Sequence, residues 1–198
     1  MRLPRLAIHS VLLAAVPIVA TAQRREAPPV AVGALSGASV VTSEPGDSYR
    51  TGVQVGALAE LRTPVDWLAV RLDLGYRHFG MQSFSAIDQN GRPTGEEYRQ
   101  RMRLLSGTAD VVVRIPDLRA RVRPYALAGV GRYRRAYRIA ASDGREIGSA
   151  RFSSNGVNAG AGLEAALTRV TVFAEARYER VRHAQLGLVP IDIGIRVP

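Results

Sequence analysis

The 198-residue chain contains no cysteine, and it contains no lysine, so arginine supplies all of its strongly basic side chains. Without cysteine there is no disulfide framework, no thiolate metal site and no lipid-modified cysteine after an export signal. No histidine cluster or acid-rich loop indicates a metal site. The segment Gly129-Val130-Gly131 lacks the remainder of the glycine pattern that binds nucleotides. We therefore expect no metal and no cofactor.

The charge balance narrows the choice of partners. The chain has 27 basic residues against 17 acidic ones, a formal net charge of +10. A strongly basic balance can indicate nucleic-acid binding. Here, however, the arginines are spread along the chain behind an apparent export signal, which argues against that partner. Anionic lipid head groups suit the charge better.

The N-terminus has the features of a secretory signal peptide over residues 1–22: early arginines, an apolar core and a small-x-small cleavage site. The apolar core, residues 6–20, is too short for a membrane-spanning helix, and Pro17 interrupts it. We expect a signal peptide over residues 1–22, a polar leader over residues 23–29 and a single domain over residues 30–198. No other stretch could span a membrane as a helix, so an alternating barrel is the only membrane-spanning option.

Alternation with a period of two dominates the last quarter of the chain and indicates β-strands. Val157 and Leu163 lie on a face that is apolar for nearly the whole run, whereas Gly160 and Glu164 belong to the opposite face. A transmembrane barrel turns its apolar face to lipid and fills its interior with small and charged side chains. The alternative is a soluble lipocalin-like barrel, which would place the apolar face inside.

Eight alternating segments are separated by connections of alternating length. The long connections are residues 42–50, 80–97 and 136–154, and the short ones are residues 62–64, 116–118 and 168–169. Long loops on one side and short turns on the other are typical of an up-and-down outer-membrane barrel. The connection at residues 181–185 is short for a fourth long loop. The sequence therefore predicts an all-β, eight-stranded antiparallel transmembrane barrel with both ends on the short-turn side.

Four segments carry a family resemblance: R-P-Y-A-L-A-G-V-G at residues 123–131, G-A-G-L-E at 160–164, F-A-E-A-R-Y at 173–178 and I-D-I-G-I-R at 191–196. In this order they resemble the small eight-stranded outer-membrane barrels of the OmpA/OmpX type. The resemblance implies a monomer in the bacterial outer membrane and the barrel assembly machinery as a partner during biogenesis. The chain departs from the family in its last residues, Val197-Pro198, because members usually end in an aromatic residue that this machinery reads.

Nine ionisable residues alternate with the apolar, lipid-facing positions of their strands, so they are predicted to face the barrel interior: Glu60, Arg71, Asp73, Asp110, Glu164, Glu175, Arg177, Asp192 and Arg196. Paired carboxylates could perform acid–base chemistry. However, an eight-stranded barrel is just wide enough for side chains to fill, and buried charges must be paired. We interpret the nine as a structural network of ion pairs. Six acids exceed three arginines, so some acids must lie near the ends, carry a proton, or pair with Arg77 or Arg132.

Two functional alternatives remain open. A lipid-modifying enzyme could use His78, which is followed by Ser83, Ser85 and Asp88. However, outer-membrane deacylases carry His-x-Ser on a strand, which neither His78 nor His183 has, and a triad is defined by geometry rather than by spacing. A narrow pore is disfavoured by the filled interior. We predict a structural and surface-interaction protein and no enzyme.

Seven arginines cluster where the fourth segment begins and the fifth ends: Arg99, Arg101, Arg103, Arg132, Arg134, Arg135 and Arg138. Antiparallel pairing would bring them to one outer edge, and guanidinium groups bind phosphate bidentately. We predict contact with lipopolysaccharide, the alternative being a solvated cluster that faces the loops. The facing of the fifth segment is ambiguous. Arg135 faces lipid if Tyr125 and Tyr133 do; otherwise Arg132 and Arg134 take its place.

Overall fold

The structure, a computed structural model, describes residues 30–42, 51–87, 89–90, 92–115, 121–182 and 186–198. The predicted signal peptide and leader therefore lie outside the described residues. Eight strands follow one another: β1 (Val30–Val41), β2 (Gly52–Arg62), β3 (Leu68–Ile87), β4 (Pro93–Arg114), β5 (Val122–Ala141), β6 (Glu146–Leu167), β7 (Val170–Val181) and β8 (Leu186–Val197). Within the part of the chain that is described, no helix is long and apolar enough to cross a membrane.

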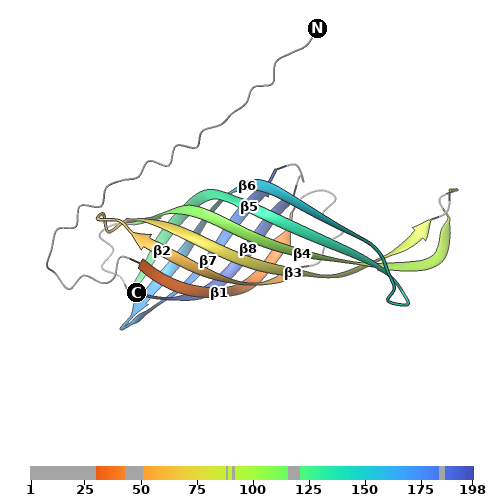
Figure 1. Cartoon of the computed structure of the whole chain (residues 1–198). Helices are drawn as coiled ribbons and strands as arrows, with labels where there is room; N and C mark the ends of the chain where they lie inside the picture. The colour runs from red at the N-terminus through yellow and green to blue at the C-terminus, as the bar shows by residue number, and fades with distance from the viewer. Residues whose placement is uncertain (1–29, 43–50, 88, 91, 116–120, 183–185) are drawn as a thin grey trace, which may run out of the picture.

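Each strand pairs antiparallel with the next, and β1 pairs with β8 to close the ring (Figure 1). The closing register runs from Val32 opposite Val197 to Val41 opposite Leu188. The predicted eight-stranded up-and-down barrel is confirmed. Closure removes the free strand edges that would otherwise have to be hidden from the membrane.

The apolar face of each strand points outward. Exposed fractions reach 67% for Leu74, 61% for Val130 and 64% for Ile193, whereas Glu60 and Asp110 are buried. The lipocalin-like alternative is therefore wrong, because its charges would face the solvent and its apolar side chains would fill the core.

Exposed aromatic residues mark the two limits of the apolar band. Trp67 precedes β3 on the short-turn side, and Tyr76 lies near the middle of the same strand. Nine residue steps separate them; at about 3.3 Å per residue and a tilt of about 40° they rise about 23 Å, close to the roughly 25 Å expected of a lipid-facing band. Tyr178 on β7 is also exposed and ends the band there.

The strands have two lengths. The four strands β3 to β6 have 20 to 22 residues, whereas the other four have 11 or 12. Figure 1 shows two hairpins, β3–β4 and β5–β6, running well past the other strands. The prediction of long loops over residues 80–97 and 136–154 was wrong in this respect, because most of these residues continue the ladders of β3–β4, β4–β5 and β5–β6.

We call the projecting part the extension (residues 80–101 and 132–155) and the rest of the ring the barrel body. Pairing of β2 with β3 ends at Gly52 opposite Phe79, and pairing of β6 with β7 begins at Gly156 opposite Val181. The described residues of the extension therefore form a four-stranded sheet outside the ring. The β5–β6 hairpin turns at Ser142–Arg145, where Gly144 has a φ of 86° that other residues rarely adopt.

The facing of β5 is now settled. Tyr125, Leu127 and Tyr133 are buried and point inward, whereas Val130 points outward. Inside the outer end of the ring lies an apolar cluster, which we call the upper plug: Val41, Phe79, Met102, Leu104, Tyr133, Val181, Leu186 and Leu188, with Tyr137 packed against it. Below this plug, charged side chains share the interior with a second apolar cluster: Leu58, Ala69, Val112, Tyr125, Leu127 and Phe173, with Leu35 packed against it.

Candidate functional sites inside and outside the barrel

The structure places all nine predicted interior residues inside the barrel, each at most 8% exposed. It adds three that the sequence reasoning did not include among them: Arg77, Arg114 and Glu179. Arg114 and Glu179 could have been found by parity alone. Arg114 shares the parity of Asp110 on β4, and Glu179 shares that of Glu175 and Arg177 on β7.

Ion pairs cross the lumen between β3 and β7, which lie on opposite sides of an eight-stranded ring. Arg71 on β3 places Nη2 2.7 Å from Glu175 Oε1, and Arg177 on β7 places Nη2 2.5 Å from Asp73 Oδ2. Arg177 also contacts Asp110 on β4, at 3.0 Å. These guanidinium groups therefore span the barrel diameter and obstruct it.

A second cluster lies nearer the short-turn end. Arg114 contacts Glu60 at 2.8 Å and Glu164 at 2.9 Å. Arg196 contacts the same two carboxylates, at 2.5 Å and 2.8 Å. Two arginines and two acids from β2, β4, β6 and β8 thus form a closed ring of charge that ties alternate strands together.

The third cluster lies beneath the upper plug. Arg77 pairs with Glu179 across the lumen at 2.5 Å, and its Nε donates to Gln54 Oε1. Gln54 in turn donates to Asp192, which has no ion pair with any described arginine. Glu179 is not among the six acids predicted for the interior, and Arg132 points outward and pairs with no described acid. Neither arginine therefore forms an ion pair with one of those six acids.

This arrangement constrains the chemistry of the interior. Each charged cluster is held by two to four strands, and every carboxylate in it already accepts hydrogen bonds. Groups so paired are poorly available as general acids or bases. No group of three or more metal-binding side chains occurs among the described residues.

On the outside, six of the seven clustered arginines are exposed: Arg99, Arg101, Arg103, Arg132, Arg134 and Arg138. The seventh, Arg135, is only 9% exposed and points inward. Arg135 therefore drops out of the predicted contact set, and the second predicted arrangement applies, in which Arg132 and Arg134 take its place. Arg135 shares the parity of Tyr125 and Tyr133, and these rings occupy the interior.

Two further arginines of β7 and its end belong to the same surface, although the sequence reasoning missed them. Arg180 and Arg182 are exposed and share the outward parity of Tyr178. The backbone N–H of Arg182 donates to the carbonyl of Asn155, which lies opposite Arg132 on β5. Arg132 and Arg182 are thus separated by a single strand.

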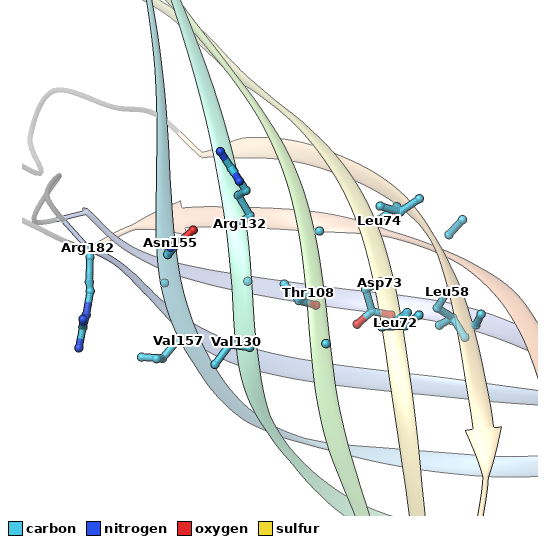
Figure 2. A pocket seen from close by; sticks show the side chains of 16 residues that line it. Leu58, Leu72, Asp73, Leu74, Thr108, Val130, Arg132, Asn155, Val157 and Arg182 are labelled. Atoms are coloured by element: carbon cyan, nitrogen blue, oxygen red, sulfur yellow. The ribbon is translucent and has the colours of Figure 1, made fainter. Parts of the chain in front are cut away.

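A shallow groove of about 1000 Å³ runs across the outer face below these arginines. In Figure 2, Arg132, Asn155 and Arg182 lie at one end, whereas the outward-facing Leu72 and Leu74 lie toward the other. The groove exists because the outward residues of β2 and β4 at this level are small: Ala57, Ala59, Gly107 and Ala109. Branched side chains line the rest of it: Leu72, Leu74, Val130 and Val157. An adjoining depression of about 510 Å³ shares Leu74, Gly107 and Arg132 and adds Leu105 and Arg134.

His78 has a different setting from that of a catalytic base. It lies on the outward face of β3, half-buried, between Val53 on β2 and Arg103 on β4. None of the described serines or acids forms a hydrogen bond with it. The neighbouring Arg103 offers no acceptor that could orient the imidazole as a base.

A family model described as the outer membrane protein beta-barrel domain matches residues 10–187, most of the chain. The chain belongs to this family. It is therefore an outer-membrane β-barrel protein of the bacterial outer membrane, as predicted. No curated protein matches it.

Solved structures of outer-membrane barrels share its fold. Neisserial surface protein A is 18% identical, with a TM-score of 0.56 over 87% of this chain and 99% of that one. A major outer membrane protein from Thermus thermophilus is 12% identical, with a TM-score of 0.59 over 85% and 97%. The attachment invasion locus protein Ail of Yersinia pestis is 14% identical, with a TM-score of 0.50 over 85% and 95%. At these identities the likeness concerns the fold alone.

Proposed function

We propose that this outer-membrane barrel binds lipopolysaccharide through the arginines on the outward face of β4, β5 and β7. Phosphate groups would meet the guanidinium groups, and an acyl chain would lie in the groove below them. The observation that carries the proposal is the position of Arg132 and Arg182 at one end of an apolar groove. A lipid with an anionic head group and apolar tails matches this arrangement, in which a basic patch lies next to an apolar groove.

The charges on this face support the proposal because most of them have no protein partner. Arg138 pairs with Glu146 at 3.0 Å. Among described residues, no ion pair joins an acid to Arg101, Arg103, Arg132 or Arg134. Arg101 lies directly opposite Arg138, and Arg134 lies opposite Leu105 at the edge of the apolar band. Like charges at such spacing repel each other unless anions intervene. Phosphates of the outer leaflet would supply those anions, through bidentate hydrogen bonds that arginine is shaped to make.

The experiment compares two triple variants with the same change in charge. R132Q/R134Q/R182Q removes the arginines at the groove, whereas R92Q/R145Q/R151Q removes three exposed arginines of the extension that lie outside the proposed contact surface. We expect the groove variant to retain roughly tenfold less lipopolysaccharide after mild-detergent purification, since about 1.4 kcal/mol of binding free energy corresponds to that factor. Retention by the wild type should fall with added salt.

The control variant should retain nearly as much lipid as the wild type. Equal losses in both variants would mean that net charge alone attracts the lipid, and unchanged retention in the groove variant would remove the proposal. Folding of each variant is checked by faster migration of the unboiled protein on a detergent gel.

Within the membrane we propose a structural role for the interior network and neither catalysis nor steady conductance. Three guanidinium groups reach across the lumen, those of Arg71, Arg77 and Arg177, and the upper plug lies above them. The closed ring leaves no strand edge in the barrel body for a second copy, which supports a monomer. Insertion by the barrel assembly machinery belongs to the same proposal.

A further inference from the structure

Arg135 differs from every other buried arginine of the described chain. Arg71, Arg77, Arg114, Arg177 and Arg196 each form an ion pair with a carboxylate. Arg135 is also largely buried, at 9% exposed, yet no described carboxylate lies within ion-pair distance of it. A buried charge without a counter-ion is costly, so this position calls for a separate explanation.

Aromatic rings enclose the Arg135 guanidinium. Its central carbon lies 5.9 Å from the ring centroid of Tyr137 and 5.7 Å from that of Phe152. Nη1 donates to the Tyr137 hydroxyl at 3.2 Å, whereas the buried Nε has no partner. Cation–π contacts hold the guanidinium plane in place, but they satisfy none of its N–H groups. Donors of fixed orientation therefore remain available to an acceptor.

The site opens to the exterior and not to lipid. Arg135 lies opposite Leu104 on one side, directly above the upper plug, and opposite Phe152 on the other. Phe152 is 50% exposed, and at its level β6 has no pairing with β7, since that pairing starts at Gly156. The inner face of the extension thus leaves one side of the cluster accessible from the outer mouth of the barrel.

Positive charge gathers at the outer mouth of the barrel. The outward face of the same strands carries the unpaired arginines described above, with Arg134 as the immediate neighbour of Arg135 on the opposite face. Clustered charge of one sign raises the local concentration of counter-ions and speeds their arrival. A planar guanidinium with free N–H groups, held between rings, is suited to an oxyanion.

We infer that Arg135, Tyr137 and Phe152 form a binding site for an oxyanion, a carboxylate, sulfate or phosphate group, that enters from the exterior. This site is independent of the proposed lipid contacts, because it lies on the inner face of the sheet. The oxyanion can be free in solution or be carried by a larger extracellular molecule. Both sources share the same chemistry at Arg135.

The test uses refolded full-length barrel in detergent without lipopolysaccharide. The protein is titrated with sodium sulfate and sodium phosphate, and with sodium chloride at matched ionic strength. The arginine Nε–H resonance of Arg135 reports on the site, and the unfolding temperature reports on binding overall. We expect saturable shifts with the oxyanions and none of comparable size with chloride.

Arg134→Gln is the matched control for Arg135→Gln, because the two residues are adjacent, carry the same charge and face opposite sides. We expect R135Q to bind sulfate at least about tenfold more weakly, and R134Q to bind it within about twofold of wild type. If R135Q does not fold, the Nε–H resonance of Arg135 in the wild-type protein still shows whether sulfate binds there and chloride does not. A response that matches chloride, or one that persists in R135Q, overturns the site.

Two further arms identify the source of the oxyanion. A sulfated or carboxylated oligosaccharide that competes with sulfate for the Arg135 resonance supports an extracellular carrier, and binding of the small ions alone supports a free anion. A shift seen only with lipopolysaccharide micelles overturns the assignment. Loss of lipid retention in R134Q with sulfate binding intact would separate this site from the lipid surface.

Discussion

In the barrel body and in the extension, polar and apolar side chains alternate along each strand. In the body most charged side chains face inward, whereas in the extension most of them face outward. In the body, β4 points Asp110 inward and Val111 outward. In the extension, β5 places Tyr137 on the inner face and Arg138 on the outer one, where it is exposed. On β4 the outward-facing side chains change from apolar to charged between Leu105 and Arg103. We infer that lipid surrounds the body and that water surrounds the far end of the extension, because the medium around a strand decides which of its faces is polar.

The comparison teaches that the pattern of one strand can record where it leaves the membrane. When the outward-facing side chains change from apolar to charged within an unbroken strand, the sequence alone suggests that the strand has ended. Here this change marks the upper plug, where apolar side chains replace charged ones inside the ring. The plug separates the ion-pair network from external water, and inside that dry space charge pairs are strong and unpaired charges are costly.

The largest expected effect is that of Arg177→Ala in the body. The change leaves Asp110 without an ion pair to any described arginine and leaves Asp73 and Glu175 with Arg71 alone, and we expect a loss of about 3–5 kcal/mol in the free energy of unfolding. Urea unfolding of the protein in lipid vesicles measures it. Arg138→Ala in the extension removes only a solvated pair and should cost about 0–1 kcal/mol.

Similar costs for these two arginines would show that the interior network is no more important to stability than a surface ion pair. The difference between body and extension would then be one of location only.

A smaller effect tests the medium around each region. Leu72 in the body and Ile147 in the extension are both exposed, at 57% and 47%. Leu72→Arg should lower stability by about 2–4 kcal/mol because it puts a charge against lipid. Ile147→Arg should change it by less than about 0.5 kcal/mol because its surroundings are aqueous. An equal penalty at both sites, measured by the same unfolding assay, would place the extension inside the bilayer.

The smallest effect concerns glycine. A Cβ at Gly162 would lie 2.5 Å from Tyr125 Cζ and 2.6 Å from the Ala174 carbonyl oxygen, whereas one at Gly148 would meet nothing within 4 Å. Gly162→Ala should therefore cost about 1–3 kcal/mol by overpacking the body, and Gly148→Ala in the extension should be nearly neutral. A neutral Gly162→Ala would mean that Tyr125 can move aside, although its hydroxyl donates to Glu175 at 2.6 Å.

The sequence by itself determined the number of strands, their order and, for every strand except β5, which face meets lipid. These follow from a period of two and from the separators between runs, both of which are local properties. The same parity placed residues such as Glu175 and Arg196 on the inner face. The family was predicted from the resemblance of four segments in order, which apolar-out alternation behind a predicted signal peptide supported.

Only the tertiary structure decided the partners, the facing of β5 and the extent of the long hairpins. On β5 both parities carry apolar residues, and the choice depends on Gly162 making room for Tyr125 inside a closed ring. Ladder pairing carried β3 to β6 beyond the membrane, where polar sequence resembles a loop. The same facing put Arg135 between Tyr137 and Phe152 instead of against lipid. Such choices depend on register and closure, which join residues over a hundred positions apart, as Arg71 and Glu175 are joined, and no local pattern specifies them.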